Sequence, residues 1–225
     1  MANDEPEYEA RAADRLIFFS DAVVAIAITL LAIDLPVPTG ATLSLFLSSA
    51  RHNDGHYAAF LISFLAIAGA WSQHHDVFRY LKRMDSRLRT LNMAWLMMIV
   101  LIPFATKLLT ASGHDNVGAH ALRFGFYALV QLLASAAMLA MVHHMISGQL
   151  QEPHTPARIV TDANWQAAAV MLGFGLSIPV FFATNYAWLL WIVIPPLVGR
   201  LHRRQTRRDL SSWSGRGTRR PIVAA

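Results

Sequence analysis

The chain has 225 residues, of which 55% are hydrophobic and only 15% are charged, and it carries a formal net charge of +5. A soluble domain of this size needs more charged surface than this, so the composition predicts an all-α integral membrane protein. The sequence contains no cysteine. Disulfides, thiolate metal sites and cysteine nucleophiles are therefore excluded.

Apolar runs of roughly 20 residues predict six transmembrane helices. Their expected spans are 16–36, 57–79, 89–110, 120–146, 163–182 and 184–201. The run "ATLSLFLSSA" at 41–50 is too short to cross a bilayer, and we expect a short helix there at the interface. Polar residues with glycine or proline predict loops at 112–118 and 151–158.

Basic residues near the helix ends predict the orientation. They gather between the second and third helices (Arg79, Lys82, Arg83, Arg87 and Arg89) and after the last helix (Arg200, Arg203, Arg204, Arg207, Arg208, Arg216, Arg219 and Arg220). With six helices both groups and both termini lie on the cytoplasmic side of the cell membrane. We expect a six-helix transmembrane domain at 1–202 and a basic, disordered tail at 203–225, whose arginines contact anionic lipid and not nucleic acid.

The first predicted helix, "RLIFFSDAVVAIAITLLAIDLP" (15–36), keeps two charges in an apolar run. Arg15 and Asp21 lie about 240° apart around a helix, so each must find a partner on another helix, in water or at the headgroups. Helical spacing forms one stripe from Ala22, Ile26, Thr29 and Ile33, with Leu30 at its edge, and a separate stripe from Asp21, Val24, Ile28 and Leu31.

Two sequence blocks resemble one family of membrane proteins. "RLIFFSD" fits Arg-x-x-x-Phe-Ser-Asp through Arg15, Phe19, Ser20 and Asp21, and "WSQHHDVFRYLKRMDSRLRTLN" covers 71–92. Both are similar to segments of the transmembrane protein 175 family of potassium-permeable channels. A single Phe-Ser-Asp motif resembles the prokaryotic branch, whose members assemble as tetramers.

This resemblance implies that the first helices of a homotetramer line a central pore for potassium ions. The family's bulky constriction falls here on Ile26, with Leu30 or Ile33 one and two turns further out, and its threonine linked to potassium preference falls on Thr29. The plainer interpretation is that the isoleucines are ordinary packing residues and that the Thr29 hydroxyl bonds to its own helix.

The resemblance also implies a polar network that supports the first helix. In the family the arginine and aspartate of the motif are held with a histidine from the second helix. In this sequence the network would consist of Arg15, Ser20 and Asp21 with either His74 or His75. The spacing from Trp71 favours His74. The alternative from the residues alone is that Arg15 reaches the cytoplasmic interface and Asp21 pairs locally.

Other functions have weaker signals. His52 and His56 are four apart, but Asn53, Asp54 and Gly55 disfavour the helix that a zinc pair needs, so we expect no metal and no cofactor. The sequence has no Gly-x-Ser-x-Gly elbow and no glutamate in a predicted span, so we expect no enzyme. A secondary transporter is the main alternative, because Gly173, Gly175 and Pro179 can break the fifth helix, although the halves show no convincing repeat.

Overall fold

The computed structural model describes residues 4–111, 117–184 and 186–214, and within these ranges the fold is all-helical. The helices are α1 (Asp4–Ile33), α2 (Leu43–His52), α3 (Asp54–Phe78), α4 (Ser86–Thr110), α5 (Val117–Ser147), α6 (Ala157–Phe181) and α7 (Leu189–Ser214). The predicted all-α fold is confirmed, and α2 corresponds to the short helix expected at 41–50. Most of the loop expected at 112–118 lies outside the described residues.

Five helices of the described chain are long and apolar enough to cross a membrane. They are α3, α4, α5, α6 and the part of α1 from Arg11 to Ile33. The sixth span, expected at 184–201, is not confirmed, because residues 186–188 form a turn and only Leu189–Leu201 make a short apolar helix. A perpendicular span needs about 20 apolar residues.

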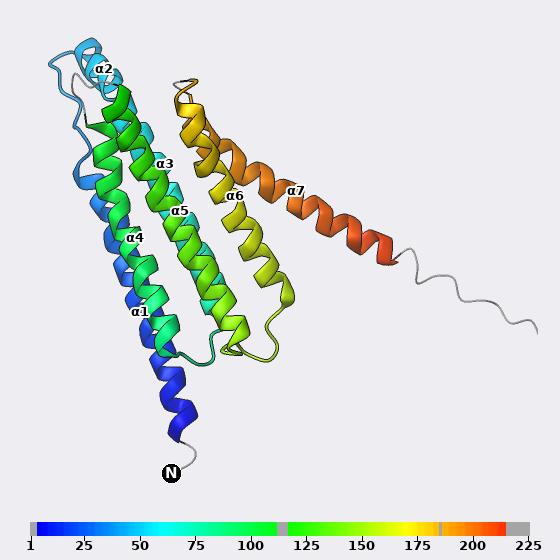
Figure 1. The fold of residues 1–225 in the computed structure, drawn as a ribbon. Coiled ribbons are helices and arrows are strands. Elements are labelled where there is room, and N and C mark those ends of the chain that lie inside the picture. The colour runs from blue at the N-terminus through cyan, green and yellow to red at the C-terminus, as the bar shows by residue number, and fades with distance from the viewer. Residues whose placement is uncertain (1–3, 112–116, 185, 215–225) are drawn as a thin grey trace, which may run out of the picture.

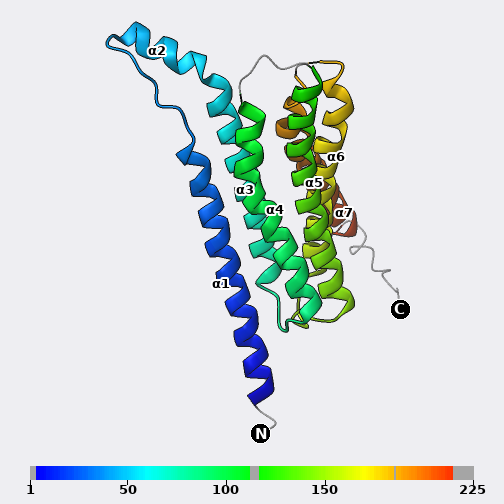
Figure 2. The same cartoon turned by 60° about the vertical axis from the view of Figure 1, so that its left-hand side comes forward.

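The helices are packed in an order that leaves α1 at one side of the bundle. Helix α1 packs on α3 and α4, α5 packs on α4 and α6, and α7 packs on α6. Figure 2 shows α1 on the side of the molecule away from α6 and α7. The N-terminal end of α1 lies at the same end of the bundle as the α3–α4 and α5–α6 connections, whereas α2 lies at the opposite end (Figure 1).

The α3–α4 and α5–α6 connections are joined by backbone hydrogen bonds. The N–H groups of Lys82 and Arg83 both donate to the Leu150 carbonyl, at 2.9 and 3.0 Å, and the Glu152 N–H donates to the Tyr80 carbonyl at 2.9 Å. The basic segment between α3 and α4 is therefore held in an ordered connection.

Asp85 lies where this connection enters α4. One carboxylate oxygen accepts the Leu88 N–H at 2.7 Å and caps the helix, and the other lies 2.7 Å from Nε2 of His144 on α5. Burial acts to raise the pKa of Asp85, but the hydrogen bonds from Leu88 and His144 outweigh it, so the pKa is lowered. Asp85 thus links the start of α4 to the end of α5.

The basic tail differs from the expectation in its first part. Helix α7 continues to Ser214, so the residues from 203 to 214 are helical in the structure, whereas 215–225 lie outside the described residues. The stretch "RRQTRRDLSSWS" contains no proline or glycine, and arginine and glutamine favour helix, so the helix continues past the apolar segment.

Candidate pore-lining helix

Helix α1 has one buried face and one exposed face. The buried face consists of residues spaced three or four apart: Ala13, Leu16, Ser20, Val24, Ala27 and Leu31. It packs against α3 and α4. The small side chains of Ala13, Ser20 and Ala27 allow close approach between membrane helices. The opposite face is exposed in the described part of the chain.

The stripe predicted from the sequence lies on the exposed face. Ile26 is 58% exposed, Leu30 39% and Ile33 74%, and Ala22 and Thr29 are exposed beside them. The Thr29 hydroxyl donates to the Ile26 carbonyl at 2.8 Å, as the plainer interpretation expected. A hydroxyl has one hydrogen and two lone pairs, so this bond leaves the oxygen able to accept or to coordinate.

A buried chain of three polar side chains connects α1 to α3 and α4. Ser20 donates to the Leu16 carbonyl at 2.8 Å and accepts from Asn92 Nδ2 at 2.9 Å, while Asn92 Oδ1 lies 2.9 Å from His74 Nε2. Ser20, Asn92 and His74 are fully buried. Since the Ser20 hydrogen is used on α1, the Asn92 amide must face Ser20 with its NH₂ group, and His74 must donate from Nε2.

The His74 ring is fixed by its neighbours as well as by this bond. It stacks between Phe78 and Trp95, with ring centroids 3.9 and 4.5 Å away. Its Nδ1 atom is buried and has no hydrogen-bond partner among the described residues. His75, the other candidate, is exposed and lies beside Trp71. His74 is therefore the histidine that is linked to Ser20 of α1, through Asn92.

The two charged residues of the motif lie outside this chain of hydrogen bonds. Asp21 accepts from Trp71 Nε1 at 2.8 Å, which makes a second link between α1 and α3. Arg15 is exposed, and in the described part of the chain it has no hydrogen bond or ion pair. Sequence reasoning missed Asn92 and Trp71. The signal for Asn92 was its position as a single amide in the apolar run of the third helix.

The opposite end of α1 is fastened by two further contacts. Lys107 of α4 forms an ion pair with Asp34 at 2.8 Å, directly after α1. The Tyr57 hydroxyl of α3 donates to the Pro36 carbonyl at 2.8 Å. With the Ser20 and Asp21 contacts in the middle of α1, these bonds fix the rotation of the helix and keep the face with Ile26 turned away from α3 and α4.

Metal binding has no support in the described part of the chain, where no group of three or more His, Asp and Glu side chains could hold an ion. His114 and Asp115, which the sequence placed on the same side as His120, lie outside the described residues.

Comparisons with known proteins agree with this geometry. The family described as "Endosomal/lysosomal potassium channel TMEM175" matches residues 15–103. A potassium channel of Streptomyces collinus is 32% identical over 167 residues, which cover 74% of this chain and 81% of that protein. A potassium channel of Chamaesiphon minutus is 38% identical over 97 residues, covering 42% of this chain and 48% of that one.

A solved structure gives the same result at the level of the fold. The crystal structure of a lysosomal potassium-selective channel TMEM175 homolog from Chamaesiphon minutus has a TM-score of 0.65 and 26% identity, and the match covers 86% of this chain and 98% of that one. The matching family is one of channels and not of enzymes. The chain belongs to the TMEM175 family of potassium channels.

Proposed function

We propose that the protein is a potassium-permeable channel in which the α1 helices of four subunits surround one pore. The observation that carries this proposal is the two-faced α1 helix. One face is fixed to α3 and α4 through Ser20 and Asp21, and on the other face Ile26, Thr29 and Ile33 are exposed in the described part of the chain. A single such helix cannot enclose a pore, so a pore along this face would need symmetry copies.

Ile26, Leu30 and Ile33 would narrow this pore. Rings of aliphatic side chains around a narrow axis expel water, and an ion then meets a dewetting barrier. Thr29 lies between the first and last of these rings. Its hydroxyl oxygen keeps its lone pairs because the hydrogen is used on the Ile26 carbonyl. Four such oxygens would replace part of the hydration shell of a potassium ion without a fixed charge.

The orientation and the sixth span belong to the same proposal. The N-terminal end of α1 and the basic α3–α4 connection lie at one end of the bundle (Figure 1), in agreement with a cytoplasmic location for both. Helix α7 packs on α6 and would complete six spans if the bilayer thins locally around its short apolar part. Both termini would then lie in the cytoplasm, at the cell membrane.

The proposal is tested by recording from purified protein in planar bilayers with potassium on one side and sodium on the other. We expect unitary currents, which a transporter does not give. Ile26→Ala should raise the unitary conductance because it widens the constriction. Thr29→Ala should move the reversal potential towards zero because it removes the coordinating oxygen.

Leu172→Ala is the matched control. Leu172 is an exposed aliphatic residue of α6, a helix that packs mainly on α5 and α7 and not on α1. It should leave both quantities unchanged. Currents that are the same in all three variants and the wild type would remove α1 as the lining of the pore.

A further inference from the structure

A cavity lies within the membrane-spanning part of the bundle, between α3, α5, α6 and α7, with Trp95 from α4. Its volume is about 420 Å³, within the range of sites for small organic ligands, and its lining is mostly apolar. The lining residues fall within 61–73 of α3, 131–138 of α5 and 166–174 of α6, in the middle of three candidate membrane spans. Among the described residues none of α1 lines it, so the cavity is separate from the exposed face of α1.

Helix α3 leaves open space on the side of this cavity. Gly69 lines the cavity, and a side-chain carbon added to it would meet no atom within 4 Å. A glycine that no neighbouring helix packs against allows a bound molecule to approach the helix backbone closely. The lining also includes Leu61, Leu65 and Ile192, whose side chains are exposed. The cavity therefore opens at the side of the bundle, where a membrane protein contacts lipid.

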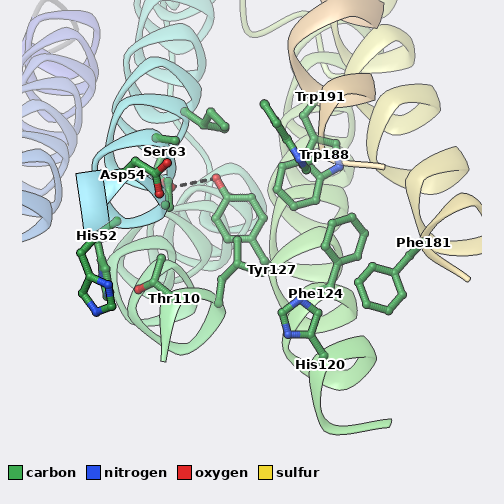
Figure 3. A pocket seen from close by; sticks show the side chains of 16 residues that line it. His52, Asp54, Ser63, Thr110, His120, Phe124, Tyr127, Phe181, Trp188 and Trp191 are labelled. Carbon is green, nitrogen blue, oxygen red and sulfur yellow. Dashed lines mark hydrogen bonds between the residues drawn. The ribbon is translucent and has the colours of Figure 1, made fainter. Parts of the chain in front are cut away.

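A chain of hydroxyl groups fixes the orientation of the Gln131 amide. The Thr106 hydroxyl donates to the Ile102 carbonyl at 2.8 Å, so it accepts from Ser63 at 2.7 Å. Ser63 in turn accepts from the Tyr127 hydroxyl at 3.0 Å, the hydrogen bond drawn in Figure 3. The Tyr127 oxygen then accepts from Nε2 of Gln131 at 3.2 Å. Because each hydroxyl has one hydrogen, the amide must face Tyr127 with its NH₂ group, and its oxygen keeps both lone pairs.

Two polar groups of α5 reach the cavity with unused hydrogen-bonding capacity. Gln131 is only 5% exposed, it lines the cavity, and its oxygen has no donor within the described residues. Ser135 lies one turn further along the same face and lines the same cavity, and in the described ranges its hydroxyl has no partner either. The nearby Gln73 amide is already used, since it donates to the Ala163 carbonyl at 3.0 Å.

These two groups determine which kind of molecule fits the cavity. A polar group in apolar surroundings is unfavourable until it finds a hydrogen-bond partner, and a lipid acyl chain offers none. A hydroxyl group can donate to the Gln131 oxygen and accept from Ser135. We propose that this cavity binds an apolar molecule that carries a hydroxyl group, which enters from the bilayer and places the hydroxyl between Gln131 and Ser135.

The test compares the binding of 2-naphthol with that of naphthalene, which lacks only the hydroxyl group. The full-length protein in detergent micelles is dialysed to equilibrium against each labelled probe, with protein-free micelles as the blank. The wild type should bind 2-naphthol saturably, and it should bind naphthalene about fivefold more weakly. The measurement involves no ion current, so its outcome is independent of the proposed pore.

Substitutions separate the hydrogen bonds from the space. Gln131→Leu removes the acceptor and should weaken the binding of 2-naphthol by about fivefold, while naphthalene binds as before. Ser135→Ala should act in the same direction. Gly69→Leu fills part of the cavity and should abolish the binding of both probes. Gly125→Leu is the matched control, because Gly125 also has open space around an added side-chain carbon but lies outside the lining. It should bind both probes as the wild type does.

Absence of saturable 2-naphthol binding by the wild type would overturn the proposal. So would equal affinity for the two probes, which is the behaviour of a cavity that accepts only acyl chains. Binding of 2-naphthol that persists in Gly69→Leu would place the probe outside this cavity. A Gln131→Leu protein that still prefers 2-naphthol by the same factor as the wild type would contradict the role of the amide oxygen.

Discussion

Asn92 is the residue that orients the polar contacts beneath α1. It is fully buried and forms hydrogen bonds with both Ser20 of α1 and His74 of α3. An amide suits this position because it donates on one side and accepts on the other. A leucine or an alanine can do neither, so the histidine N–H would remain buried without an acceptor.

We therefore expect Asn92→Ala to destabilise the fold by roughly 1–3 kcal/mol, the cost of an unsatisfied buried donor. Thermal unfolding in detergent micelles measures this as a lower midpoint. Met93→Ala, at the adjacent exposed position, should shift the midpoint far less. In combination with His74→Ala, the Asn92→Ala loss should be smaller than it is alone, because the two residues act as a pair. Additive losses would contradict the hydrogen-bonded chain.

At the scale of the element, α4 and α5 are held together at the end of the bundle that carries the basic connection. Asp85 caps α4 and contacts His144 of α5, and the two neighbouring connections exchange backbone hydrogen bonds. Asn92 lies on the same helix. Unwinding of the first turn of α4 would therefore also displace the Asn92 side chain, which bonds to Ser20 of α1.

This arrangement predicts a dependence of stability on pH. The pKa of Asp85 is lowered below its usual value of 3.8, so the folded state binds a proton less readily than the unfolded state. The stabilisation is present above that usual value and is lost as the pH falls through the lowered pKa. The side chain is 42% exposed, so solvent screening keeps the effect below about 1 kcal/mol.

Thermal midpoints of wild type and Asp85→Asn measured from pH 6 down to pH 3 provide the test. Asparagine still caps the helix, so the variant isolates the charge. The gap between the two midpoints should be widest at the upper end of the series and should narrow as the carboxylate is protonated. A constant gap over the whole series would show that the Asp85 charge contributes nothing.

At the scale of the whole molecule, the apolar runs of the sequence predicted the helices, and the spacing of Ile26, Thr29 and Ile33 predicted that they share one side of α1. It did not predict the partners of Ser20 and Asp21. Periodicity shows that a polar residue faces another helix, but which residue it meets depends on the rotation and height of that helix. Asn92 and Trp71 can be identified as these partners only from the packed positions of α3 and α4.

The last helix was harder to predict for a different reason. The expected span began at 184, but Tyr186, Ala187 and Trp188 form a turn before α7, and the apolar part of α7 is correspondingly short. Hydropathy counts residues in a window and does not register a turn within it. The arginines beyond Leu201 then continue the helix, because charge alone does not end one.

The most direct test of the central claim uses the lack of cysteine in the chain. Single cysteines at Ile26 and at Val24, on the exposed and buried faces of α1, are treated with a water-soluble cationic thiol reagent during bilayer recording. A pore shared by four α1 helices predicts that the current through Ile26→Cys is blocked, whereas Val24→Cys conducts as before. A current through Ile26→Cys that the reagent leaves unchanged, with the thiol shown to react, would contradict it.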